Sequence, residues 1–135
     1  MRALDTNVLA RFFIDDADDP QAVAQRPAAI AALSARAFVS VTVLLEFEWV
    51  MRGFYDMTRA EISQVLRGLM SFEQVSIEDR NAVLSALDAF DLGMDFADAV
   101  HLARVGRASA FLTFDRRLAH RAGVIPLAPR VELLS

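Results

Sequence analysis

Short apolar runs of β-strand character recur between stretches of helical periodicity along the whole chain. These runs are Arg2–Leu4, Ala37–Val41, Gln74–Ile77, Ala110–Thr113 and Val124–Leu127. Strands that alternate with helices are typical of an α/β domain with a mainly parallel sheet. No repeat, low-complexity tract or linker interrupts the pattern, so we expect one domain over residues 1–135.

A few residues predict where the helices begin, bend and end. Thr58 and Glu61 have the spacing of a capping box, which starts a helix. Pro27 is expected to interrupt or kink the helix that contains it, because proline has no amide proton to donate. Gly93 and Gly123 stand where helix C-termini are expected, since glycine tolerates positive φ.

The composition excludes several classes of site. There is no cysteine, hence no disulfide or thiolate centre, and all fourteen basic residues are arginine, so lysine-dependent phosphate and Schiff-base chemistry is absent. The start of the chain does not resemble a signal peptide and no apolar run is long enough to span a membrane, which favours a cytoplasmic protein. The 55% hydrophobic content indicates additional buried interface, and we expect self-association.

Four carboxylates lie at corresponding places in the predicted α/β pattern. Asp5 and Asp115 each stand where a strand turns into a helix, Asp98 lies at the start of a helix, and Glu46 lies one turn into another. Ligands of open α/β sheets bind beyond the carboxyl ends of the strands, where these side chains can converge. Converging carboxylates need a cation, and Mg²⁺ or Mn²⁺ prefers oxygen ligands, which gives the outline of a metal-dependent hydrolase. The net charge of −4 lacks the basic footprint of a nucleic-acid binder, but it overstates the surface acidity if cations bind among these acids.

Each acid also has an ordinary structural interpretation, which the sequence leaves open. Asp5, Asp95 and Asp115 are all suited to be helix N-caps. Asp98, in a first helical turn, is favoured there by the helix dipole. Glu46 is otherwise a residue at the boundary of the core.

Neighbouring polar residues raise the same choice. Asn7 can cap a helix that begins at Val8 or hold a carboxylate in position, and Thr113 can orient a ligand beside Asp115. His101 is predicted to have a solvent or packing role rather than to bind metal, because it lies about 60° around the helix from Asp98.

The helix expected from Val43 to about Phe54 can be phased by its apolar residues. The stripe consists of Val43, Phe47, Val50 and Phe54. This phase predicts that Glu46 borders the core, that Glu48 faces solvent and that Trp49 lies partly off the core face.

Four motifs resemble, in order and spacing, those of the PIN-domain ribonucleases, and most closely the VapC toxins of type II toxin–antitoxin systems. They are "LDTNVL" at 4–9, "VTVLLEFEWV" around Glu46, "DFADAVHLA" at 95–103 and "LTFDRRL" at 112–118. The resemblance extends from Arg2 to about Leu127.

The resemblance implies a three-layer α/β/α fold with a short, mainly parallel central sheet. It implies an endoribonuclease that hydrolyses RNA phosphodiester bonds with a water activated by Mg²⁺ or Mn²⁺. The catalytic metal ligands are then Asp5, Glu46, Asp98 and Asp115, and Asp95 corresponds to an extra acid found in a subset of the family. The family also implies a homodimer that is neutralised by a small VapB-type antitoxin.

Arginines must supply any phosphate contacts, because the chain has no lysine. The candidates on elements near the expected cleft are Arg11, Arg52, Arg104, Arg107, Arg116 and Arg117. For each one the alternative is a solvated charge. Apolar residues around Phe12, Phe13, Trp49 and Phe54 are similarly either dimer or antitoxin surface, or internal packing.

Two other functions compete with the nuclease. A haloacid-type phosphatase also places an aspartate after its first strand, but it needs a second aspartate two residues later and a lysine. This chain has Asn7 there and no lysine. A non-catalytic interaction module of the same fold remains the alternative, and metal-dependent nuclease activity discriminates between the two.

Overall fold

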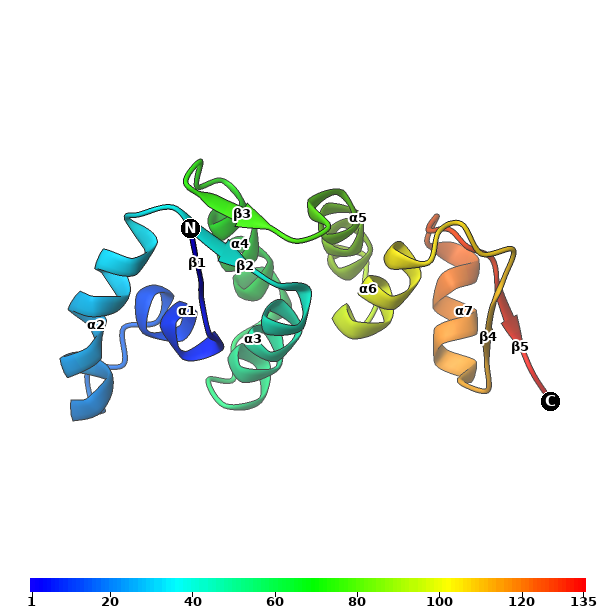
Figure 1. Ribbon diagram of the computed structural model, residues 1–135. Coiled ribbons are helices and arrows are strands. Elements are labelled where there is room, and N and C mark those ends of the chain that lie inside the picture. Colours follow the sequence, from blue (N-terminus) through cyan, green and yellow to red (C-terminus); the bar gives the residue numbers. More distant parts are fainter. The chain divides into compact units, whose positions relative to one another are not determined.

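The computed structural model describes all residues from Met1 to Ser135, and they form two compact units, Met1–Glu78 and Asp79–Ser135 (Figure 1). Both units combine helices with short parallel strands, which confirms the predicted α/β class. None of the helices has the length and apolar character needed to cross a membrane.

The first unit contains a three-stranded parallel sheet in the order β1-β2-β3. The strands are β1 (Arg2–Ala3), β2 (Ala37–Val39) and β3 (Val75–Ile77). Its helices are α1 (Thr6–Phe13), α2 (Pro20–Leu33), α3 (Val41–Gly53) and α4 (Arg59–Met70). Helix α1 packs against both α2 and α3, so the segments that follow β1 and β2 lie side by side (Figure 1).

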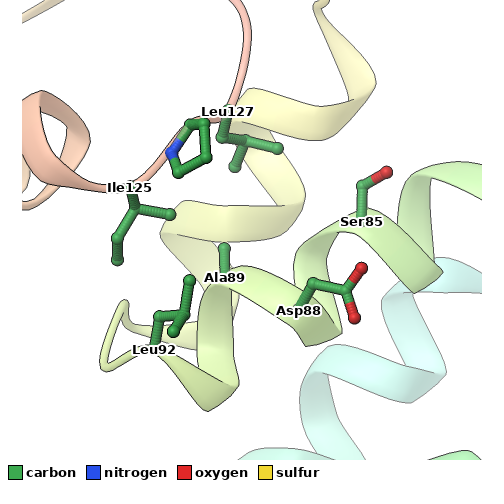
Figure 2. A pocket seen from close by; sticks show the side chains of 7 residues that line it. Ser85, Asp88, Ala89, Leu92, Ile125 and Leu127 are labelled. Atoms are coloured by element: carbon green, nitrogen blue, oxygen red, sulfur yellow. The ribbon is translucent and has the colours of Figure 1, made fainter.

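The second unit begins with two helices that pack extensively on each other, α5 (Arg80–Asp91) and α6 (Phe96–Arg104). They are followed by β4 (Phe111–Thr113), α7 (Arg116–Val124) and β5 (Val131–Leu133). Strands β4 and β5 pair in parallel, and α7 lies beside both (Figure 1). A cavity of about 240 Å³ lies between α5 and the segment after α7, and Figure 2 shows its mainly apolar lining.

Several sequence-based boundaries are confirmed and others are wrong. The capping box of Thr58 and Glu61 is present in both directions, with Glu61 N donating to Thr58 Oγ1 and Thr58 N donating to Glu61 Oε1. The prediction of the fifth strand at residues 124–127 is wrong. Val124 is the last residue of α7, and β5 lies further along the chain, at Val131–Leu133. Helix α2 runs through Pro27 without interruption.

The two glycines predicted at helix ends differ from each other. Gly93 follows the end of α5 with φ +111°, a conformation that L side chains rarely adopt, as expected for a residue that ends a helix. Gly123 lies inside the last turn of α7 and does not have positive φ. Only Gly93 has a backbone conformation that requires glycine.

Helix α3 is rotated relative to the phase predicted from its apolar residues. Its buried face consists of Val41, Leu44, Phe47, Glu48 and Met51. The prediction for both glutamates is therefore wrong, because Glu48 is 3% exposed and Glu46 is exposed. Burial of Glu48 is tolerated because Arg52, one turn later, donates from Nε to Glu48 Oε2 at 2.9 Å.

Two of the three phenylalanines whose role was open are half-buried and pack on another aromatic ring of the first unit. Phe12 and Phe13 both contact the ring of Phe72, with centroid distances of 5.8 and 6.1 Å. Phe54 and Trp49 are instead exposed, and the prediction that Trp49 lies off the core face is confirmed.

Candidate active site

Asp5 is held at the end of β1 by the first turn of the helix that follows. The preceding residue, Leu4, is buried in the core, whereas Asp5 is exposed and has extended φ and ψ angles of −84° and 162°. Asp5 Oδ1 accepts a hydrogen bond from Thr6 N at 2.8 Å, so the residue is the N-cap of α1. The capping interpretation is confirmed, and it leaves the carboxylate at the surface where a ligand can reach it.

A buried threonine connects the Asp5 segment to Glu46. The side chain of Thr6 is in the core, with 3% of the residue exposed, and its Oγ1 donates to Glu46 Oε1. Glu46 itself lies one turn into α3, which Ser40 caps through its hydroxyl oxygen. Sequence reasoning did not assign this role to Thr6, because its sequence neighbours Asp5 and Asn7 are polar and give no sign that its side chain is buried.

Asn7 does not cap a helix. Because α1 begins at Thr6, Asn7 is already its second residue, and that part of the alternative is wrong. Its exposed side chain lines two neighbouring cavities of the first unit. A supporting role beside Asp5 stays a prediction.

The acids of the second unit are placed by two further N-caps. Asp95 Oδ2 accepts from Asp98 N at 3.1 Å at the start of α6. Asp115 Oδ1 accepts from Arg117 N at 2.9 Å and from Leu118 N at 3.1 Å at the start of α7. Thr113 Oγ1 accepts from Asp115 N at 2.9 Å, so this threonine orients the backbone of the acid.

Asp98 lies in the field of both capping aspartates. Its pKa is raised above the usual value for an aspartate, first by partial burial and then by the negative charges of Asp95 and Asp115. His101, one turn along α6, lowers the pKa and offsets part of this effect. The second unit therefore concentrates negative charge around a partly buried carboxylate, which a cation would stabilise.

The donor chemistry of these acids fits a hard divalent cation, since carboxylate oxygens are the ligands that such ions prefer. Within neither unit, however, do three or more histidine, aspartate or glutamate side chains lie close enough together to hold a metal ion. Asp5 and Glu46 belong to the first unit, and the three aspartates belong to the second.

The six candidate arginines differ in how strongly they are engaged. Arg52 pairs with buried Glu48, and Arg104 Nε pairs with Asp79 Oδ2 at 2.9 Å. Arg11 donates from Nε to Gln25 Oε1 at 2.9 Å. The remaining three are exposed and form no ion pair in the structure, namely Arg107, Arg116 and Arg117.

Comparison with known proteins identifies the family. The family model of the PIN domain matches residues 2–124, which include all of the candidate acids. A search of the curated proteins found no match to the chain. PIN domains are generally nucleases, and PIN nucleases typically use divalent metals. Since the match covers nearly the whole sequence, the chain belongs to the PIN domain family.

Proposed function

We propose that this chain is a Mg²⁺- or Mn²⁺-dependent endoribonuclease that acts as the toxin of a VapBC-type toxin–antitoxin system. The catalytic residues are Asp5, Glu46, Asp98 and Asp115, working as a single catalytic domain. The observation that carries the proposal is the acid group of the second unit, where partial burial and then the charges of Asp95 and Asp115 raise the pKa of Asp98, within a match to a nuclease family. Such crowding is costly for the protein alone and is relieved by a bound cation.

The four catalytic acids would hold the metal, which supplies Lewis-acid activation of the attacking water and stabilises charge on the leaving oxygen. The chain's other residues orient these acids. The hydroxyl of Thr6 fixes one oxygen of Glu46, and the hydroxyl of Thr113 fixes the backbone amide of Asp115. Asn7 and Asp95 are proposed as supporting groups beside them.

We assign phosphate binding to the exposed arginines that form no ion pair. Arg116 and Arg117 directly follow Asp115 at the start of α7, and Arg107 is exposed in the segment before β4. Their guanidinium groups suit bidentate contacts with phosphate. Arg52 and Arg104 already have carboxylate partners, which makes them weaker candidates.

A cognate VapB-type antitoxin and a second copy of the chain complete the proposal. Large apolar side chains stay exposed in both units, including Phe54 at 73% and Phe114 at 74%, and such side chains suit protein partners. Co-purification with the product of a neighbouring reading frame tests the antitoxin, and the molar mass in solution tests the dimer.

The central test is cleavage of single-stranded RNA by the purified chain with and without Mg²⁺. Asp5→Asn and Asp98→Asn should both lose activity. Asparagine caps a helix as well as aspartate does, so the first substitution removes charge and keeps the start of α1. Asp18→Asn, in the exposed loop before α2, is the matched control and should cleave like the wild type. If Asp98→Asn cleaves as fast as the wild type, the assignment is wrong.

The toxin role has its own test. Expression of the wild-type chain should arrest growth, whereas expression of Asp98→Asn should not. Mapping of RNA ends that appear after brief expression, with the inactive variant as background, identifies the RNA that is cut.

A further inference from the structure

A small cavity with aromatic walls lies between α1 and α3 in the first unit. Its volume is about 230 Å³. Its lining includes Asn7, Arg11, Asp19, Trp49, Phe54 and Tyr55. We call it the Trp49 cavity. It is smaller than the usual pocket for a drug-sized ligand, which suggests that it accepts one ring system rather than a helix.

The aromatic side of the cavity is open to solvent. Trp49 is 60% exposed, and its Cε2 lies 3.8 Å from where a Cβ on Gly53 would be, so the indole lies along the last turn of α3. Phe54 is 73% exposed and packs edge-on against Tyr55, with ring centroids 4.8 Å apart. Exposed indole and phenyl rings provide faces on which a planar ligand can stack.

The other side of the cavity is polar and held in place by hydrogen bonds. Arg11 donates to Gln25 at 2.9 Å and from Nη1 to the Tyr55 hydroxyl at 3.5 Å. Asp19 Oδ1 accepts from Gln21 N at 3.0 Å as the cap of α2. The cavity thus combines aromatic faces with a fixed cation and a fixed anion, which suits a flat ring with donors and acceptors on its edge.

The cavity is also next to proposed catalytic residues of the same unit. Trp49 follows Glu46 by three residues on α3, and both side chains are exposed, so they are neighbours on one face of that helix. Asn7, on the opposite wall, follows Asp5 by two residues. A ligand in the cavity would therefore lie within one helical turn of Glu46, and its opposite wall belongs to the helix that Asp5 caps.

We propose that the Trp49 cavity binds one unstacked nucleobase of a single-stranded RNA, with Trp49 as the stacking surface and Arg11 and Asp19 facing the base edge. This inference rests on the proposed ribonuclease function and adds a base-binding subsite to it. Proteins recognise single-stranded RNA by stacking splayed bases on aromatic side chains, whereas phosphate contacts alone do not need an indole.

The test measures RNA binding without metal, so that cleavage plays no part. The probe is a labelled hexamer of adenylate, compared with a hexamer of the same length that has ribose phosphates but no bases, and binding is followed by fluorescence anisotropy in EDTA. Trp49→Ala should weaken binding of the adenylate hexamer by roughly 5- to 100-fold, the range for loss of one stacked base. Trp49→Phe keeps an aromatic face and should stay within about threefold of the wild type.

Two further variants test whether the effect on binding is specific to the cavity. Phe54→Ala should also weaken binding of the adenylate hexamer, and Val23→Ala, an exposed apolar residue on α2 outside the cavity, should not. The proposal is overturned if Trp49→Ala binds the adenylate hexamer like the wild type, or if the wild type binds both hexamers equally. An equal loss of affinity for the hexamer without bases also overturns it, because the contact is then with the backbone.

The same experiments distinguish a nucleobase site from a dimer interface. They also distinguish failure of the subsite from failure of the proposed nuclease function. If Trp49→Ala converts a dimer into a monomer, the surface is an interface between copies and the nucleobase proposal fails. Cleavage that depends on Asp98 without any effect of Trp49 on binding overturns the subsite alone. Binding of bases that depends on Trp49, without metal-dependent cleavage, supports the subsite and overturns the nuclease.

Discussion

The two units hold their acidic residues in different ways. In the first unit, Asp5 caps its own helix and Glu46 accepts a hydrogen bond from buried Thr6, so hydrogen bonds fix both carboxylate groups. In the second unit, Asp95 and Asp115 are also hydrogen-bonded caps, but Asp98 has no comparable partner and lies in their repulsive field. We infer that the first unit pre-orients its acids through contacts, whereas the second stores unfavourable charge that a cation would relieve.

The largest expected effect tests the charge of the second unit. Asp98→Asn should reduce metal-dependent cleavage by roughly 100-fold or more, because even the outer partners of metal ligands are typically worth 10- to 100-fold. The same change should raise the melting temperature of the metal-free protein, because it removes a partly buried charge and its repulsion by Asp95 and Asp115, and it breaks no side-chain hydrogen bond of Asp98. The gain should be small, since solvent screens a carboxylate that is only partly buried. A metal-free variant that melts below the wild type would contradict the repulsion argument.

The next effect tests the hydrogen bond of the first unit. Thr6→Val keeps the shape of the side chain and removes the hydroxyl that holds Glu46. We expect a loss of roughly 10- to 100-fold in metal affinity or in cleavage at limiting metal. Thr6→Ser retains the hydroxyl and is the matched control, which should recover most of the activity.

The loss must also be separated from simple destabilisation. Metal binding can be followed without turnover through quenching of Trp49 fluorescence by Mn²⁺, because this is the only tryptophan in the chain and it lies one turn from Glu46. If Thr6→Val and the wild type give the same Mn²⁺ titration, Thr6 has only a packing role.

A smaller effect tests whether the backbone just before the acids of the second unit requires glycine. Gly93 precedes Asp95 by two residues and has φ +111°, and Arg121 Nη1 of α7 would lie 3.0 Å from a Cβ at this position. Gly93→Ala should therefore destabilise the protein by about 1–2 kcal/mol in a denaturant titration.

Gly123 provides the contrasting control within the same unit. A Cβ at this position meets nothing within 4 Å, and the residue is helical. Gly123→Ala should be neutral or stabilise the protein by up to about 1 kcal/mol. Equal effects of the two substitutions would rule out a special role for Gly93.

The sequence predicted the helix caps better than it predicted which faces are buried. Asp5, Asp95 and Asp115 act as caps because capping is a local property of the few residues around a helix start. The phase of α3 failed because apolar residues occur on nearly every side of this helix, so that the stripe through Val43 and Val50 was not distinguishable from the true one. Burial of Glu48 depends on its pairing with Arg52, which binary patterning does not represent.

The prediction of the strand boundaries was limited by the shortness of the strands. Each strand has two or three residues, too few for an alternating pattern to separate a strand from the end of a helix. Thus Val124 and Ile125 read as a strand although the first ends α7, and the real strand, Val131–Leu133, was missed. The joint use of the four acids is a long-range property that stays a prediction from the resemblance to PIN-domain nucleases.

The smallest effect tests the hydrogen-bonded character of the first unit away from its acids. The pKa of Tyr55 is raised, first by burial and then by the charge of Asp16, which accepts the phenol hydrogen bond at 3.4 Å; Arg11 lowers it in part. Because the folded protein holds this proton more tightly than the unfolded chain, the stability that Tyr55 contributes is present below the ordinary phenol pKa and is lost as the pH rises through the folded value.

Asp16→Asn should lower the pKa of Tyr55 without restoring the ordinary value, since burial remains. Tyr55 is the only tyrosine, so phenolate absorbance reports it alone. Asp18→Asn, on the same loop, should leave the titration unchanged, and a shift as large as that of Asp16→Asn would mean that general loop charge, rather than this contact, controls the phenol.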